Sequence, residues 1–320
     1  MRITKKFAGE LLEVLEEIRN EFFKGKKTRY PFSEWERRRE KVRERLGKLP
    51  EYVRRATEMI ELKKDGAGRP EKLDLTQRTM LFLFARLMNK SNRDVEELLE
   101  FLEPLFGFKV SYKSVERLYS DEEVKMALYN LFLLLLEDEG VSGDFAGDGT
   151  GYSLVVEKHY RKDPKKKSRD YRYVFRLTDL KTGMYVGYGY SRKSEMEAFH
   201  RAMEIVRRFG IKIDSISLDK YYSSRKVLEQ FEVETAVYII PKKNLSKLGF
   251  GWAKVIRRIA ENPFMYLRKY FLRNISEAGY SADKRRFGWT IRQRREDRQE
   301  MAMFSIALLH NVFATRVAPG

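Results

Sequence analysis

The feature that most constrains the fold is a change of hydrophobic periodicity near Gly140 and Gly143. Before this point, apolar residues recur every three or four positions, which is typical of amphipathic helices. After it, apolar and aromatic residues occur in short, partly alternating runs that are separated by turn residues, which predicts strands. We therefore expect an all-helical first part followed by an α/β part.

The first helices are predicted from apolar spacing and start signals. Apolar residues at helical spacing predict one amphipathic helix over residues 7–22, and a capping box at residues 33–36 opens a second. Pro50 is expected to precede a third helix. These helices form a predicted N-terminal region, 1–64, which a linker rich in glycine and proline, 65–75, separates from the next domain.

A compact helical domain is expected over residues 76–140. Three of its helices, the last of which spans residues 112–119, resemble a helix-turn-helix module, in which Lys113 and Arg117 would reach DNA. A plain helical bundle explains the same pattern equally well. Arg69 of the linker is a candidate for insertion into a minor groove, against the simpler interpretation of a linker residue. The expected helix caps are Asp74, Ser91, Ser111 or Ser114, and Ser120.

Residues 141–320 read as three strands, a helix, a strand, a helix, a strand and further helices. A kink is expected at Pro263 in the last helical stretch, and residues 165–169 (KKKSR) form a charged hairpin tip. The expected strands are 144–157, 171–177, 184–190, 213–218 and 235–240, and the expected helices are 194–209, 224–231 and the segment from Trp252 onwards.

The net charge is distributed unevenly. The chain has 65 Lys and Arg against 47 Asp and Glu, a net of +18. Residues 1–140 hold 29 basic and 27 acidic side chains, a net of +2, and residues 141–320 hold 36 and 20, a net of +16. A mixed-charge surface of the thermophilic kind accounts for the first part but not for the excess in the second. That excess favours binding to phosphates of a nucleic acid.

Several classes of protein are excluded by composition. The absence of cysteine excludes a disulfide scaffold, a zinc ribbon and a thiol nucleophile, and three scattered histidines do not make a zinc site. No phosphate-binding glycine motif is present. The strongly apolar run at 131–136 is too short to cross a bilayer of about 30 Å, and the acidic N-terminus does not read as a signal peptide. We expect a cytoplasmic, nucleoid-associated protein without a membrane partner.

Three carboxylates are the candidates for chemistry on a phosphodiester. Asp148 lies between glycines on the first strand, Asp219 ends the fourth strand, and Glu277 lies on a helix. Mg²⁺ prefers oxygen ligands, and two ions about 3.5–4 Å apart can serve the attacking and the leaving oxygen. Each acid alone reads as an ordinary surface residue, but strand order and basic surroundings favour a site. Asp144 and Asp214 are rival acids at the wrong ends of their strands.

Four residues of the Glu277 segment are predicted to share one helical face. At about 100° per residue, Tyr270, Arg273, Glu277 and Lys284 fall close together. An aromatic ring, two cations and one acid do not make a core stripe. They suit a helix that offers a metal ligand flanked by cations for phosphates.

The four residues resemble the Y-x2-R-x3-E-x6-K signature of DDE transposases from prokaryotic insertion sequences. The run Asp148-Gly-Thr-Gly is similar to the first aspartate motif of that family, and Asp219-Lys-Tyr-Tyr-Ser is similar to the second. The ending Ala-Leu-Leu-His-Asn at 307–311 is also similar. The resemblance covers about 145–317 and does not extend to residues 1–60.

The resemblance implies an RNase H-like catalytic domain over 141–320, with a mixed sheet flanked by helices and the first strand beside the fourth. It implies that Asp148, Asp219 and Glu277 are catalytic and bind two Mg²⁺ or Mn²⁺ ions. Any insertion between the second aspartate and the glutamate should be small. The implied DNA contacts in this domain are Tyr270, which would support the helix or the DNA, Arg273, Lys284 and Arg285.

The implied function is a DNA transposase of the cut-and-paste type. It would bind the terminal inverted repeats of an insertion sequence, cleave a strand and transfer it to target DNA. Its partners would be double-stranded DNA, as transposon ends and target, and a second copy of the chain in a synaptic homodimer. The alternatives are an RNase H-like metal-dependent nuclease and a non-catalytic DNA-binding protein descended from a transposase. A tyrosine recombinase fits poorly with the three scattered histidines.

Overall fold

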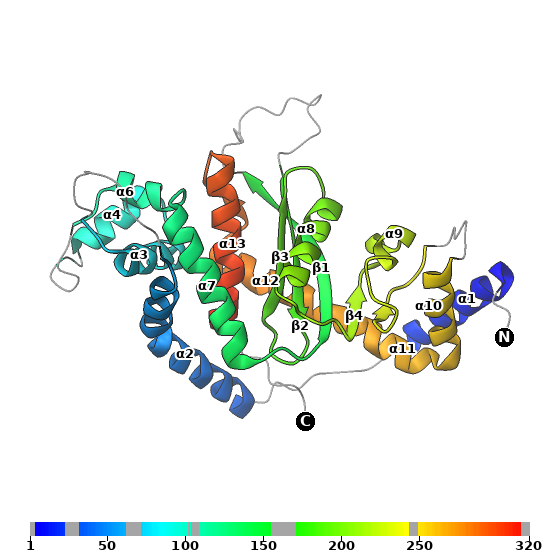
Figure 1. Ribbon diagram of the computed structural model, residues 1–320. Helices are drawn as coiled ribbons and strands as arrows, with labels where there is room; N and C mark the ends of the chain where they lie inside the picture. Colours follow the sequence, from blue (N-terminus) through cyan, green and yellow to red (C-terminus); the bar gives the residue numbers. More distant parts are fainter. Residues whose placement is uncertain are drawn as a thin grey trace.

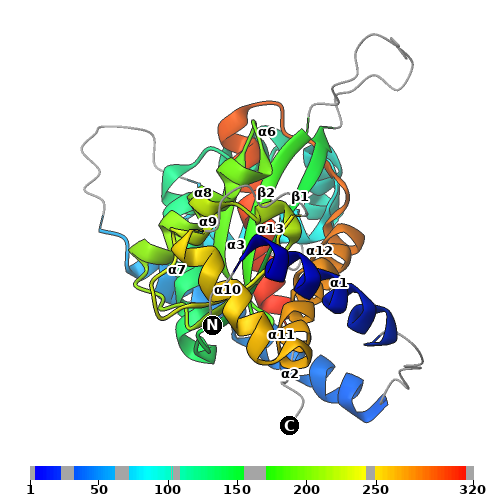
Figure 2. The ribbon, with the colours of Figure 1, turned by 90° about the vertical axis from the view of Figure 1, so that its right-hand side faces the viewer.

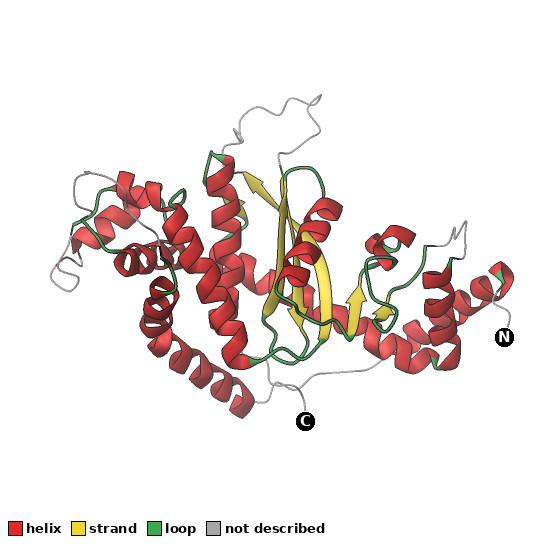
Figure 3. Cartoon of the chain, in the orientation of Figure 1, coloured by secondary structure: helices red, strands yellow, loops and turns green. Residues whose placement is uncertain are grey.

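The computed structural model describes residues 4–22, 32–61, 72–101, 103, 109–154, 171–242 and 249–314. In this part of the chain a group of helices lies beside a mixed sheet that is covered by helices on both faces (Figures 1 and 3). No helix in these ranges is long and apolar enough to cross a membrane. The linker residue Arg69 and the predicted hairpin tip at 165–169 lie outside the described residues.

The helices of the first part begin largely at the predicted caps. The Asp74 side chain accepts a hydrogen bond from the Gln77 amide at 2.8 Å, and Ser91 and Ser111 cap the next two helices in the same way. The prediction for Ser120 was wrong, because its hydroxyl donates to the Arg117 carbonyl and Asp121 is the cap. The helices are α1 (Lys5–Phe22), α2 (Phe32–Glu58), α3 (Leu75–Met88), α4 (Asn92–Phe101), α6 (Tyr112–Leu118) and α7 (Glu122–Glu139).

Pro50 does not start a new helix, contrary to the prediction. It lies inside α2, which runs unbroken for 27 residues and begins before the expected capping residue Ser33. A proline in a helix interior costs roughly 3 kcal/mol. Packing outweighs this cost, because the residues on either side of Pro50 that face α7 are buried, including Leu49, Val53 and Ala56.

The second part contains a mixed sheet, as the family resemblance implied. The strand order is β3-β2-β1-β4-β5, with β6 beside the end of β1. The first three strands are antiparallel neighbours, whereas β4 and β5 run parallel to β1. The strands are β1 (Asp144–Leu154), β2 (Tyr171–Asp179), β3 (Tyr185–Ser191), β4 (Ser215–Leu218), β5 (Ala236–Tyr238) and β6 (Thr290–Ile291).

Helices cover both faces of this sheet. On one face α8 packs so closely on β3 that a Cβ atom at Gly189 would lie 1.8 Å from the Ala198 carbonyl oxygen. On the other face lie α12 and α13 (Figure 1). Pro263 opens a separate helix at its first turn, so the chain breaks there and does not merely kink. The helices are α8 (Glu195–Arg208), η1 (Lys220–Tyr222), α9 (Arg225–Leu228), α10 (Phe250–Glu261), α11 (Pro263–Tyr270), η2 (Phe271–Arg273), α12 (Asn274–Phe287) and α13 (Glu296–Phe313).

Helix α13, which is largely buried beyond its exposed first turn, joins the two parts of the molecule. The Phe304 ring stacks on Tyr129 of α7 at 4.2 Å between centroids and lies 5.5 Å from Tyr188 of β3. At the other end of the molecule α1 packs on α10 and α11 (Figure 2). The N-terminal helices thus contact the sheet part in two places, and the proposed domain boundaries stay a prediction.

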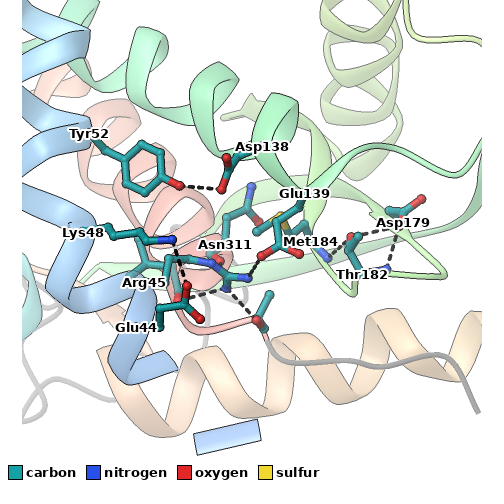
Figure 4. A network of polar contacts seen from close by, with 12 residues as sticks. Glu44, Arg45, Lys48, Tyr52, Asp138, Glu139, Asp179, Thr182, Met184 and Asn311 are labelled. Atoms are coloured by element: carbon teal, nitrogen blue, oxygen red, sulfur yellow. Dashed lines mark hydrogen bonds and ion pairs between the residues drawn. The ribbon is translucent and has the colours of Figure 1, made fainter. Parts of the chain in front are cut away.

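A polar network fastens the end of α13 to α2 and α7 (Figure 4). The buried Arg45 guanidinium donates to the carbonyls of Asn311, Val312 and Ala314 at 2.9, 3.2 and 2.7 Å and pairs with Glu139. A helix leaves its last carbonyls without intrahelical partners, so this arginine satisfies groups that would otherwise be buried unpaired.

Candidate active site

Two predicted carboxylates meet because their strands are parallel neighbours. Gly147 of β1 is paired with Leu218 of β4, so the next residue of each chain segment, Asp148 and Asp219, follows in the same register. Asp219 leaves the carboxyl end of β4, where ligands commonly bind in α/β sheets, and caps the short helix η1. The rival acids lie at the starts of these strands, as expected, and Asp144 there accepts a hydrogen bond from Ser215.

Arg273 connects Asp219 to the third predicted carboxylate. Its Nη1 atom lies 2.6 Å from Glu277 Oε1 and 3.3 Å from Asp219 Oδ2. The guanidinium stacks over the Tyr270 ring, 5.2 Å from its centroid. The buried ring of Tyr270 therefore holds the Arg273 guanidinium in position through this stacking contact. One guanidinium thus partly neutralises two acids from different elements.

The segment from Tyr270 to Lys284 is not one regular helix, contrary to the prediction. The chain tightens into the 3₁₀ turn η2 between α11 and α12, where Arg273 folds over the ring of Tyr270. Lys284 lies further along, and its Nζ atom donates to Thr150 Oγ1 at 2.7 Å. Burial lowers the pKa of Lys284. Lys284 therefore lies beside the first strand, two positions beyond Asp148.

The environment of Asp148 disfavours its charged form. Burial raises its pKa to about 7, and repulsion from Asp219, Glu277 and Glu195 adds to the effect, although a hydrogen bond from the Gly149 amide opposes it. A carboxyl group in this state gains strongly from a nearby positive charge. The carboxylates of this site therefore carry more negative charge than the single guanidinium of Arg273 can neutralise.

Glu195 is a fourth acid of this site that the sequence reasoning missed. It occupies the first turn of α8, and a Cβ atom at Gly149 would lie 3.1 Å from Glu195 Oε2. Burial raises the pKa of Glu195, and Asp219 raises it further. The sequence alone carries no signal for this position, because it depends on the sheet order: β3 runs in the same direction as β1, so Glu195 follows the carboxyl end of a strand at the same edge.

A buried scaffold behind the site also escaped sequence reasoning. Tyr280 donates to the Asp148 carbonyl at 2.7 Å, and Arg176 pairs with Asp283 at 2.6 Å. Burial alone would raise the pKa of Asp283, but its contacts with His310 and Arg176 hold it below the ordinary value. His310, read only as a scattered histidine, thus orients α12 through Asp283.

The remaining predicted DNA contacts do not join the carboxylates. Lys113 and Arg117 are exposed on α6, which lies on the far side of α13 from β4 (Figure 1). Arg285 is exposed on α12, where its Nε donates to the Ser281 carbonyl at 3.3 Å.

Metal-binding potential rests on the donor chemistry of the acids. Within the described ranges no three His, Cys, Asp or Glu side chains are grouped closely enough to hold an ion. The Arg273 guanidinium occupies the space between Asp219 and Glu277. Two buried polar atoms here, Tyr222 Oη and Arg273 Nε, have no hydrogen-bond partner among the described residues. Buried polar atoms without a partner require an explanation, and a bound water or ion would supply one here.

The fold combines a helical region with an α/β part. The α/β part carries a site made of carboxylates, although the chain as a whole is strongly basic. No protein-family model matches the chain. It is 65% identical over 316 residues to a probable transposase for insertion sequence element ISA1214 from Archaeoglobus fulgidus, a match that covers 99% of this chain and 98% of the relative. The chain belongs to the family of insertion-sequence transposases.

Proposed function

We propose that the chain is a DDE transposase with an RNase H-like catalytic domain, and that Asp148, Asp219 and Glu277 are its catalytic acids. The observation that carries the proposal is the parallel pairing of β1 with β4, which brings Asp148 beside Asp219. The ion pairs of Arg273 bring Glu277 to the same place. The strand order supports the RNase H-like assignment, because that fold places the first strand beside the fourth.

The donor set fits magnesium or manganese. All candidate ligands are carboxylates, which hard divalent ions prefer. Burial and the neighbouring acids raise the pKa of Asp148, so a bound cation would stabilise its charged form. Asp148, Asp219 and Glu277 would hold two ions, with Glu195 close by. When bound, the ions would supply charge neutralisation and activate the attacking oxygen. Arg273 would then exchange its acid partners for a DNA phosphate.

The proposed reaction has two steps on DNA. A water oxygen attacks the phosphorus at the element end, and the 3′-hydroxyl of the cleaved strand leaves. That hydroxyl then attacks a target phosphodiester, so that one P–O bond forms as another breaks. Arg273, which pairs with Glu277, and Lys284, which donates to Thr150, would hold phosphates of the DNA near the acids. Two ends must be processed together, so we propose a homodimer as the synaptic unit.

A strand-transfer assay with pre-cleaved terminal-repeat duplexes tests the proposal. D148N, D219N and E277Q should each lose joining by at least about 10³-fold, while DNA binding persists. The matched control is D214N, at the start of β4, which should join at the wild-type rate. Joining by D148N would contradict the assignment. Cleavage without joining by the wild type would favour the nuclease alternative.

A further inference from the structure

A basic cleft lies between the helical part and the sheet part, away from the acidic site. It has a volume of about 470 Å³ and is formed by the α3–α4 turn, one side of α6 and the segment that leads into α13. We call it the Arg292 cleft, after a residue of that last segment. Six of its eleven lining residues are Arg or Lys, and only Glu116 is acidic.

Three of the six cations have partners in the protein. Arg295 pairs with Asp297 of its own segment, and the other two hold the cleft in shape. Arg86 is buried and donates to Ser305 Oγ at 2.8 Å and to the Ala302 carbonyl at 3.2 Å. Arg298 pairs with Glu116, the acid of the lining. These contacts tie α3 and α6 to α13, so the wall of the cleft is fixed before any ligand arrives.

The other three cations have no direct side-chain partner in the part of the chain that the structure describes. Lys90, Arg292 and Arg294 are exposed, and none of their side chains forms an ion pair or hydrogen bond with a described residue, although the charges of Lys90 and Arg292 help to lower the pKa of Asp94 nearby. They come from two distant segments of the chain. Because their charges repel one another, holding them around one hollow costs free energy unless an anion is bound there.

A second basic hollow, on the other side of α6, differs in this respect. It holds Lys72, Arg78, Lys109 and Arg117. Arg78 pairs with Asp121 at 2.6 Å, and Lys109 pairs with Glu103 at 3.0 Å. Arg78 also pairs with Glu123, and Lys109 also pairs with Glu100. Four carboxylates thus face the four cations, although Lys72 and Arg117 themselves form no ion pair with any described residue. The positive excess is therefore larger in the Arg292 cleft.

We propose that the Arg292 cleft binds the phosphate backbone of duplex DNA, with Lys90, Arg292 and Arg294 as the contacts. The inference deepens the proposed function and rests on it. The aromatic ring of the lining, Tyr119, is buried beneath Arg86, so the cleft offers no platform for the stacking of unpaired bases. Cations spread over two elements suit a row of phosphates, which carry position but no sequence information.

The location gives this site a defined role. The segment that carries Arg292 begins at Gly288, directly after α12, and pairs through β6 with the end of β1. A Cβ atom at Gly288 would lie 3.0 Å from the Asn89 amide, so the α3–α4 turn touches the same segment. DNA held here is fixed to both parts of the chain at once. It is also held at a set distance from Lys284 and the acids.

The test is DNA binding by the full chain as a function of salt. A terminal-repeat duplex and an unrelated duplex of equal length are titrated by fluorescence anisotropy. Affinity falls as salt rises, and each phosphate contact steepens the plot of log affinity against log salt by roughly 0.9. In the triple variant K90Q/R292Q/R294Q this slope should therefore become shallower by about 3. Affinity should fall at least about tenfold, by the same factor for both duplexes.

A charge-matched control removes three exposed cations of α2, as R37Q/K41Q/R43Q, and should keep the wild-type slope. The single variant R294Q should lower the slope by about 1, and it guards against misfolding of the triple variant. An unchanged slope in the triple variant, or a loss confined to the terminal-repeat duplex, would overturn the proposal. Wild-type binding without strand transfer would refute the proposed function and leave the cleft standing, whereas no wild-type binding would refute both.

Discussion

At the scale of single residues, the burial of the proposed catalytic residue Asp148 destabilises the fold when its carboxyl group is charged. Its pKa is raised to about 7 from 3.8, chiefly by burial. A carboxyl group whose pKa is raised on folding contributes stability that is complete below about pH 4 and is lost as the pH rises through about 7. In the metal-free protein above pH 7 this carboxylate is therefore a cost to the fold.

D148N should relieve that cost. In the presence of a chelator at pH 8, the variant should be more stable than the wild type by roughly 1–3 kcal/mol, and the difference should shrink toward pH 4. Chemical denaturation at several pH values measures this directly. D214N removes an exposed acid near the start of β4 and serves as the control. Equal stabilities of D148N and wild type at pH 8 would show that burial does not perturb Asp148.

Arg45 shows what one side chain can contribute at the end of a helix. R45M would leave three carbonyls at the end of α13 and the Glu139 carboxylate without their donor. We expect a loss of about 2–4 kcal/mol in the free energy of unfolding. K48M breaks the neighbouring exposed pair with Glu44 (Figure 4) and should change little, because surface pairs are screened by solvent. Similar losses in both variants would contradict this account.

At the scale of elements, two glycines differ in the space around them: Gly189 is closely packed against a helix, whereas Gly47 faces open space. G189A places a methyl group against the α8 backbone, so it should destabilise the protein by about 1–3 kcal/mol or more. G47A adds a methyl group to exposed α2 with nothing within 4 Å, and it should stabilise by about 0.5–1 kcal/mol. Thermal unfolding of the two variants measures both signs. A stable G189A would mean that α8 can shift away from β3.

Elements were predicted well where local chemistry decides them. The capping box at Asp74 and the strand-like runs of β1 to β3 depend on neighbours in sequence, so they could be read directly. Pro50 and Glu195 could not. The fate of Pro50 is decided by packing on α7, and the place of Glu195 by a sheet order that only tertiary structure reveals. Likewise, Asp148 and Asp219 were predicted to be neighbours only through the family resemblance.

At the scale of the whole molecule, the charge asymmetry and the fold are connected. The sequence places +16 of the +18 net charge in residues 141–320, the part that holds the acids. Yet the Arg292 cleft takes Lys90 and Arg86 from the nearly neutral first part. The first part can therefore act in DNA binding through a few placed cations, which agrees with its small net charge.

The last consequence of the fold concerns cooperativity between the two parts. Phe304 of α13 contacts Tyr129 and Phe132 of α7 and Tyr188 of β3, and it is almost fully buried. The helices and the sheet thus share one core across the boundary that the sequence places near Gly140. F304A should cost about 3–5 kcal/mol, because the cavity would face both parts.

If the two parts share one core, F304A should lower the midpoint of a single unfolding transition in calorimetry, and the helices and the sheet should become sensitive to protease at the same temperature. The control F250A removes a ring of α10 that is 72% exposed, and it should leave the midpoint almost unchanged. Two separate transitions in F304A would indicate instead that residues 76–140 are an autonomous domain that merely docks on α13.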